Sequence, residues 1–323
     1  MKTFEEIKNE MRFVFSESEV SRVKFVDSIS ELKVKLVSWT SPNPYKILLE
    51  VASCTWGDYN NTDKWSRLSP EARFHIVKAV LGGRALPLAR EHLKFTFVIS
   101  GVSRAAFDEI ARARIGVAYG SKGWKDNKLR SIGFMIPSVL LSYPGFLPEL
   151  INHVKNVSKL YAKMQKLGVP NWACRSIMPM YCLYRFIMSL DYLALQQFCA
   201  NRMNFTEQED VVAVAWYMRE EIKKKFPLLA EYLRPAEDWA KKDLTDKVNG
   251  FAEELEVPNA PSGRWSVDMQ KFYQKYDVLH DKPCTDIVVL EKYLGIHIPR
   301  PDEWIDYTWE TLDKRDKAQF EED

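Results

Sequence analysis

The sequence predicts an α+β fold, with a central domain over residues 34–235 between appended segments at 1–33 and 236–323. Three observations support this. The 323 residues exceed the ~100–200 of one ordinary domain, so one large domain or a domain with appendages is expected. The composition is 46% hydrophobic and 13% aromatic, which is enough for a buried core. A few segments show the period of two that is typical of strands, among more numerous segments with helical spacing.

The first elements follow from local patterns. VKLVSW (34–39) is typical of a strand, and a helix is predicted over about 45–54. Ser69 and Pro70 suit the N-cap and first turn of a second helix, which should end at Gly82-Gly83.

A second strand and its helix come next. KFTFVIS (94–100) alternates apolar and polar residues, as a half-buried strand does. Ser103 then caps a predicted helix that runs to about Ile115. The glycines and lysines that follow, in YGSKGWKDN, predict a loop.

The second half is predicted to be mostly helical. Apolar residues recur at helical spacing before Gly168, where that helix should end. VPNWACRSIMP (169–179) predicts a short helix between prolines, and 181–203 is apolar nearly all round, which predicts a buried helix. Thr206 and Glu209 form a capping box for a helix to about Lys225.

Charge and cysteine content restrict the classes of function. The 46 basic and 44 acidic side chains give a net charge of +2, so we expect neither nucleic-acid nor membrane binding. The five cysteines are scattered, which favours reduced thiols. The first residues, MKTFEEIKNEM, lack the apolar run of a secretory signal, and no apolar stretch approaches the ~18 residues of a membrane span. A cytoplasmic protein is the expectation.

Several common sites are excluded by spacing. The five histidines stand in no zinc-binding pattern, so we expect no metal. There is also no dinucleotide-binding GxGxxG turn, no Walker A lysine and no GxSxG nucleophile elbow.

A basic stretch over residues 112–130 is the first candidate site. Asp126 is the only acidic residue in this stretch, which has six basic ones: Arg112, Arg114, Lys122, Lys125, Lys128 and Arg130. Guanidinium and ammonium groups in a glycine-containing loop can bind phosphate, although a solvated charged face has the same composition. On one continuous helix Arg112 and Arg114 would point about 200° apart, so they would hold two parts of a large ligand or two ligands.

Two further arginines lie among apolar residues. ACRSIMPM places Arg175, and QQFCANRMNF places Arg202, near a buried face. A buried guanidinium needs a partner because an unpaired buried charge is costly. The partner is either an internal carboxylate, Asp191 or Glu209, or an anionic substrate.

The order of these segments resembles a known family over about residues 34–233. HLKFTFVISGVSRAAFDEIARARIG (92–116) resembles the strand, helix and Arg-His-Arg motif of flavin-dependent thymidylate synthases. FMIP (134–137), LYAKMQKLGVPNWACRSIMP (160–179) and LYRFIMSLDYLALQQFCANRMNFTEQEDVVAVAWYMREEI (183–222) resemble later segments of that family. The resemblance implies that family's fold, in which helices pack with a small mixed sheet.

The resemblance also implies an activity. Such enzymes use FAD, with NADPH and methylenetetrahydrofolate as co-substrates, to methylate C5 of deoxyuridine monophosphate (dUMP) in sites shared between subunits of a homotetramer. Carried over to this sequence, Arg202 would be catalytic against the pyrimidine. The flavin-binding residues would be Arg112, Arg114 and Gln197, and the substrate-binding residues Glu109, Ser121, Lys122, Arg175 and Arg202.

Departures from the family pattern leave two hypotheses open. Ala113 replaces the motif histidine, Glu109 stands where glutamine is usual, and the nucleotide loop has no clear counterpart of the family's acidic residue and arginine. One hypothesis is a flavoenzyme that methylates or hydroxymethylates C5 of a pyrimidine deoxynucleotide. The other is an inactive protein of the same fold that serves as a nucleotide- or flavin-binding or assembly module.

Overall fold

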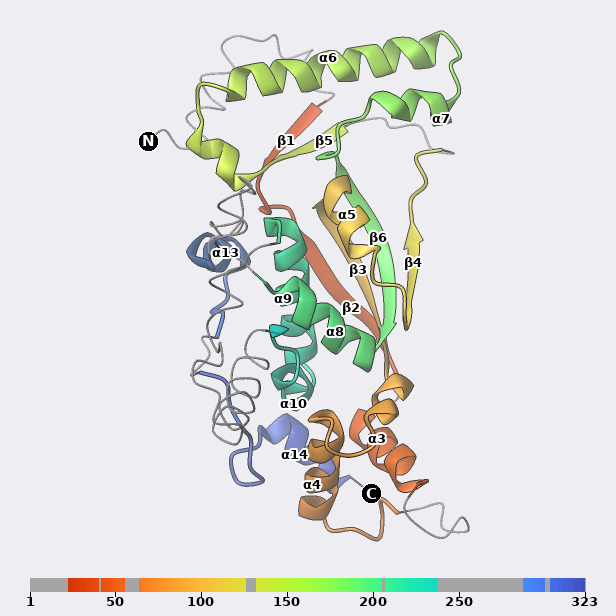
Figure 1. Ribbon diagram of the computed structural model, residues 1–323, viewed down its shortest axis with the longest axis vertical. Coiled ribbons are helices and arrows are strands. Elements are labelled where there is room, and N and C mark those ends of the chain that lie inside the picture. The colour runs from red at the N-terminus through yellow and green to blue at the C-terminus, as the bar shows by residue number, and fades with distance from the viewer. Residues whose placement is uncertain are drawn as a thin grey trace, which may run out of the picture.

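The computed structural model describes residues 23–40, 42–55, 64–125, 132–204, 207–236, 287–299 and 303–322. Its centre is a four-stranded antiparallel sheet in the order β2 (Lys33–Trp39), β3 (Lys94–Ser103), β6 (Leu183–Asp191) and β4 (Val117–Ser121). A parallel pair, β1 (Val23–Asp27) and β5 (Ile132–Ile136), lies beyond its upper end (Figure 1). The α+β prediction is confirmed.

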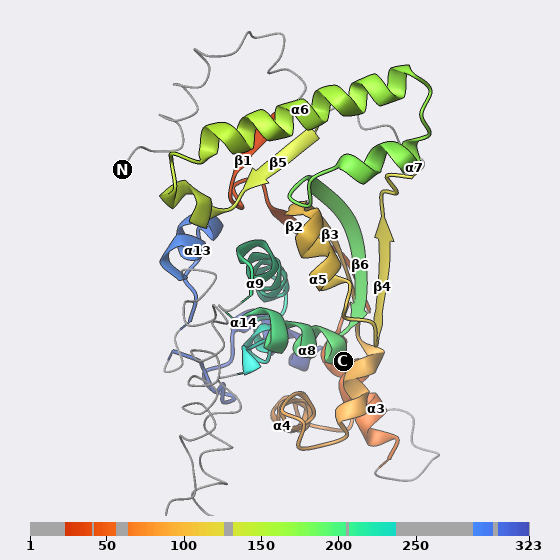
Figure 2. The same cartoon turned by 45° about the horizontal axis from the view of Figure 1, so that its top comes forward.

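One face of the main sheet is covered by helices. These are α5 (Arg104–Ile110), α8 (Tyr192–Arg202) and α9 (Glu209–Lys223), which lie together in front of the strands (Figures 1 and 2). Phe97 of β3 and Met188 of β6, which are paired in the register, point into this core and are fully buried. On the opposite face Val37 and Ile187 are each 45% exposed. The period of two in the strands therefore separates a helix-covered face from an open one.

The remaining helices form the two ends of the molecule. At one end α6 (Leu147–Lys166) covers the β1–β5 pair, with η2 (Ser138–Ser142), α7 (Asn171–Cys174) and η3 (Arg175–Ile177) beside it (Figure 2). At the other end are α3 (Pro44–Ser53), α4 (Pro70–Leu81), η1 (Pro87–His92), α10 (Pro227–Glu231) and α14 (Lys314–Glu321). A further helix, α13 (Ile287–Leu294), packs on α9.

Most predicted boundaries agree with these elements. Asn43 and Ser69 cap α3 and α4 through side-chain acceptors, and Ser103 caps α5 in the same way. The helix after Ser103 ends at Ile110 rather than near Ile115, and the first three residues of the loop predicted over 119–127 belong to strand β4 (Val117–Ser121).

The prediction of one buried helix over 181–203 is wrong. Residues 183–191 form β6, and only 192–202 form a helix, α8. Within β6, Tyr184, Phe186, Met188 and Leu190 are buried while Arg185 and Ile187 are exposed, which is the period of a strand. The side chain of Asp191 then accepts a hydrogen bond from the Ala194 N–H at 2.7 Å, and this cap starts α8.

The capping box at Thr206 and Glu209 is also wrong. Thr206 lies outside the described residues, but α9 begins at Glu209 with Gln208 as its N-cap, so Glu209 is the first helical residue and not the third. Its carboxylate instead accepts hydrogen bonds from Ser138, at the backbone N–H (2.9 Å) and at the hydroxyl. Burial raises the pKa of Glu209, and these hydrogen bonds oppose the rise.

Candidate active site

Arg202 lies at the last position of α8, where the helix dipole favours a cation. Its side chain is 15% exposed and forms an ion pair with Glu207. A second guanidinium nitrogen donates a hydrogen bond to the Glu109 carbonyl oxygen at 3.0 Å, and the Glu109 carboxylate is 3.9 Å from the first nitrogen. These contacts hold the guanidinium against the end of α5.

The expected internal partners of Arg202 are not the observed ones. Asp191 caps the opposite end of α8, about 16 Å away along an 11-residue helix, and Lys94 Nζ lies 3.3 Å from its carboxylate. Glu209 faces Ser138. The carboxylates that lie near Arg202 are those of Glu207 and Glu109.

The turn between α5 and β4 carries the two arginines of the Arg-Ala-Arg motif. Because α5 ends at Ile110, they do not lie on one helix, and both are exposed. Arg112 lies 3.0 Å from the Glu109 carboxylate, whereas Arg114 pairs with no carboxylate of the described residues. The turn therefore presents a guanidinium group to solvent.

Tyr119 of β4 fixes the shape of this turn. Its hydroxyl lies 2.7 Å from the carbonyl oxygen of Ile110 and 2.9 Å from that of Ala113. Burial raises the pKa of Tyr119 to about 12, and the charge of Arg202 opposes the rise. The hydroxyl therefore stays protonated at neutral pH and remains a donor.

The end of the turn contacts the start of α8 at Gly116. This glycine has a φ of +70°, and a Cβ atom there would lie 2.2 Å from Asp191 Oδ2 and 3.1 Å from the Ala194 Cβ. The Asp191 N–H donates to the Gly116 carbonyl oxygen at 3.0 Å. Gln197 follows Ala194 by three residues on the same side of α8, and it is exposed.

Three other predicted residues lie elsewhere. Ser121 and Lys122 are exposed at the far end of β4, roughly 13 Å from its start by strand geometry. Arg175 is exposed at the junction of α7 and η3 and not near a buried face, so that expectation is wrong. Lys128 and Arg130 lie outside the described residues. Within one chain, the predicted residues thus form two groups at opposite ends of β4.

Two residues of this site were not predicted from the sequence. Glu207 could have been noticed as the first carboxylate after the helix that ends at Arg202. The contact of Tyr119 with the α5–β4 turn has no signal in the sequence, because it depends on the pairing of β4 with β6.

Other classes of site are not evident in the part of the chain that the structure describes. No group of three or more His, Cys, Asp or Glu side chains is placed there to hold a metal ion. No helix of that part could span a bilayer. Four of the cysteines are described as free thiols, at positions 54, 174, 182 and 199.

The fold is a mixed α+β fold in which an arginine-bearing turn follows α5, and Arg202 at the end of α8 contacts the end of α5. Residues 35–228 match the family model described as thymidylate synthase complementing protein. The chain therefore belongs to the flavin-dependent thymidylate synthase family.

Known relatives carry that name. The flavin-dependent thymidylate synthase of Thermococcus onnurineus is 26% identical over 246 residues, which are 75% of this chain and 96% of the relative. That of Pyrococcus horikoshii is 27% identical over 253 residues, which are 75% of this chain and 100% of the relative.

A solved structure shares the fold. The UMP/dUMP methylase PolB from Streptomyces cacaoi, bound with 5-Br dUMP, aligns with a TM-score of 0.52 and 13% sequence identity, over 65% of this chain and 96% of that one.

Proposed function

We propose that this protein is a flavin-dependent enzyme that methylates C5 of a pyrimidine deoxynucleotide such as dUMP. Membership of the family supports the reaction class. The observation that carries the proposal is Arg202, whose planar guanidinium is held by Glu207 and the Glu109 carbonyl yet stays 15% exposed. Such a fork can donate to a pyrimidine ring edge and stabilise negative charge that develops on a ring oxygen.

The other predicted residues would bind the remaining groups of the nucleotide. Ser121, Lys122 and Arg175 are exposed donors, and a hydroxyl, an ammonium and a guanidinium are suited to a phosphate. Glu109 would act mainly through Arg202, whose guanidinium it contacts by its carbonyl oxygen.

The donors of the α5–β4 turn fit the phosphates of FAD. Arg112 and Arg114 are exposed, and Gln197 adds an exposed amide on α8. When bound, FAD would supply the hydride that reduces the transferred methylene, with NADPH and methylenetetrahydrofolate as co-substrates. The chain's own part is to hold the phosphates and to orient the pyrimidine against Arg202.

The separation of the two residue groups along β4 supports a site shared between subunits. A second chain would bring Ser121, Lys122 and Arg175 to the turn of the first, as the implied homotetramer requires. Light scattering should then report a mass near four times the 37.6 kDa chain. A monomer at micromolar concentration would contradict both the tetramer and the shared site.

Two alternatives remain within the same fold. The methylene could be captured by water, which would give a hydroxymethylated nucleotide. An inactive binding or assembly module is favoured by Ala113 in place of the motif histidine and by the neutralisation of Arg202 by Glu207.

One set of measurements separates these functions. The purified protein should show a flavin absorption spectrum after incubation with FAD, and Arg114→Ala should weaken FAD binding about ten-fold or more, because a charge-assisted hydrogen bond is lost. Mass analysis after incubation with dUMP, methylenetetrahydrofolate and NADPH should show a methylated product. A hydroxymethylated product supports the first alternative, and flavin binding without turnover supports the second. A protein that binds no FAD refutes the proposal.

A further inference from the structure

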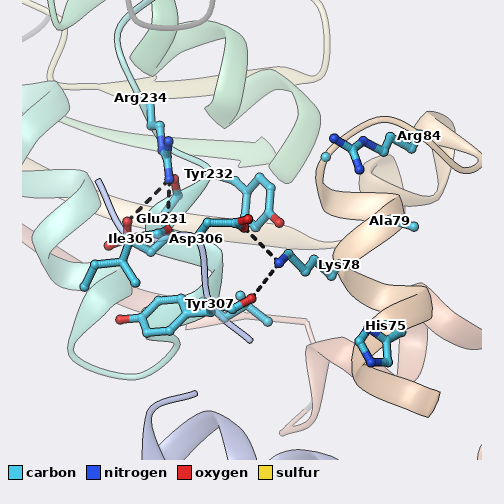
Figure 3. Close-up of a pocket in the computed structure, with 12 residues that line it drawn as sticks. His75, Lys78, Ala79, Arg84, Glu231, Tyr232, Arg234, Ile305, Asp306 and Tyr307 are labelled. Carbon is cyan, nitrogen blue, oxygen red and sulfur yellow. Dashed lines mark hydrogen bonds and ion pairs between the residues drawn. The ribbon is translucent and has the colours of Figure 1, made fainter. Parts of the chain in front are cut away.

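A cavity of about 460 Å³ lies between α4, the end of α10 and residues 305–307. Its volume is within the ~300–1,000 Å³ of small-molecule sites. It shares no residue with the candidate active site, and one wall lies beyond residues 35–228, which the family model matches. Charged and aromatic residues line it, among them Lys78, Arg84, Tyr232, Arg234, Asp306 and Tyr307 (Figure 3).

Most charges in the lining are already paired. Lys78 Nζ lies 2.8 Å from the Asp306 carboxylate and donates to the Tyr307 carbonyl oxygen at 2.6 Å. Arg234 lies 3.6 Å from the Glu231 carboxylate. The lining has three permanent cations (Lys78, Arg84, Arg234) and two carboxylates (Glu231, Asp306), so it carries one excess positive charge.

Arg84 carries that excess charge. It forms no ion pair with the described residues and is exposed at the cavity. Its backbone N–H donates to the Ala79 carbonyl oxygen at 2.9 Å, which fixes its position just after α4. Figure 3 shows Arg84 and Lys78 on the α4 side and Tyr232, Asp306 and Tyr307 across from them. An unneutralised guanidinium at a cavity favours an anionic group.

The opposite wall provides one aromatic surface, the ring of Tyr232. Tyr232 is partly buried, whereas the ring of Tyr307 extends away from Lys78 and Arg84 (Figure 3). Burial raises the pKa of Tyr232 to about 12, so its hydroxyl remains a donor at neutral pH. Aromatic side chains of this kind bind planar rings and can add a hydrogen bond.

We propose that this cavity binds a small aromatic molecule with one anionic group, a phosphate or a carboxylate, placed on Arg84, with its ring against Tyr232. A bound molecule would connect α4 to residues 305–307. It would therefore protect that segment from local opening.

The test uses the full-length protein and simple probes. Phenyl phosphate carries a ring and a phosphate, and benzoate carries a ring and a carboxylate. Inorganic phosphate lacks the ring, and phenol lacks the charge. By ligand-observed NMR titration, phenyl phosphate or benzoate should bind at least ten-fold more tightly than phosphate or phenol, and whichever is tighter identifies the anion. Arg84→Ala should weaken that binding about ten-fold or more, because a charge-assisted hydrogen bond is lost. Arg67→Ala, an exposed arginine outside the cavity, should leave it unchanged.

Hydrogen exchange locates the bound probe. Protection should appear at residues 303–310, and Arg202→Lys should leave it intact, which separates this cavity from the proposed nucleotide site. The proposal is overturned if neither aromatic anion binds, if phosphate or phenol binds equally well, or if protection appears only at residues 112–125. Arg84→Gln replaces Arg84→Ala if circular dichroism shows that the alanine variant does not fold.

Discussion

Arg202 is the residue on which the proposed chemistry depends most directly. Arg202→Lys should fold normally and retain flavin, yet lose dUMP affinity about ten-fold or more, because an ammonium cannot reproduce a planar fork against a ring edge. Calorimetric titration with dUMP measures the effect, and Arg67→Lys is the control. Unchanged dUMP affinity would refute the proposed role of Arg202.

Asp316 gives the stability of the protein a dependence on pH. It is fully buried on α14, where the Tyr45 hydroxyl donates to it and the Leu228 N–H donates at 2.7 Å. Burial raises its pKa to about 7, the charge of Asp313 adds to the rise, and the two hydrogen bonds and Arg315 oppose it. The folded state therefore favours the protonated carboxyl, while the unfolded chain ionises near pH 4.

The difference between the pKa of Asp316 in the folded state and in the unfolded chain sets the direction in which stability changes with pH. The stabilisation from protonated Asp316 is fully present below about pH 4 and is lost as the pH rises through about 7. Asn cannot ionise, so Asp316→Asn resembles the protonated form at every pH. Between pH 4 and pH 8 the unfolding free energy of the wild type should therefore fall by up to about 4 kcal/mol more than that of Asp316→Asn. Urea unfolding at several pH values measures this, with Asp108→Asn, at a side chain that is 42% exposed, as the control. A constant difference between Asp316→Asn and wild type at all pH values would contradict it.

At the scale of elements, the α5–β4 turn depends on Gly116. Gly116→Ala would force a side chain into the left-handed region and against Asp191, at a cost of about 2–4 kcal/mol. Gly120→Ala is the control, since the nearest atom to a Cβ there is 4.0 Å away in the Ile187 side chain. Chemical denaturation compares the two, and equal stability of both variants would show that the contact with Asp191 is not restrictive.

Strands with polar alternation, such as β3, and capped helices, such as α4, were predictable because their signals are local. The β6–α8 boundary was not, because the exposed face of β6 includes Ile187 and hides the period of two. At the site, the motif arginines could be identified, but the ion pair of Arg202 with Glu207 depends on how the chain turns after α8.

At the scale of the whole molecule, the C-terminal helix belongs to the same core as the first helices. Phe320 of α14 is fully buried, and its ring stacks on that of Tyr45 with 4.7 Å between the ring centroids. It also contacts the rings of Trp65 and Phe74. The guanidinium of Arg73 donates to the carbonyl oxygens of Phe320 and Glu322. The domain boundary at 235/236 remains a prediction, but α14 packs as an integral part of this end of the molecule.

Phe320→Ala should therefore cost about 3–5 kcal/mol of unfolding free energy, because it leaves a large cavity in this core. Phe146→Ala, at a side chain that is 50% exposed, should cost much less. Urea unfolding followed by tryptophan fluorescence measures both. A loss below about 1 kcal/mol for Phe320→Ala would mean that α14 does not stabilise the core.

The pairing of Tyr45 with Asp316, 271 residues apart, also concerns the order in which the protein is made. At roughly 5–20 residues per second, translation of Tyr45 precedes that of Asp316 by roughly 15–55 s. During that interval the aromatic residues of α3 and α4 are synthesised without the helix that covers them. In a nascent chain the apolar side chains that Phe320 covers thus stay without that cover until α14 has left the ribosome, and we expect chaperones to bind them in that period.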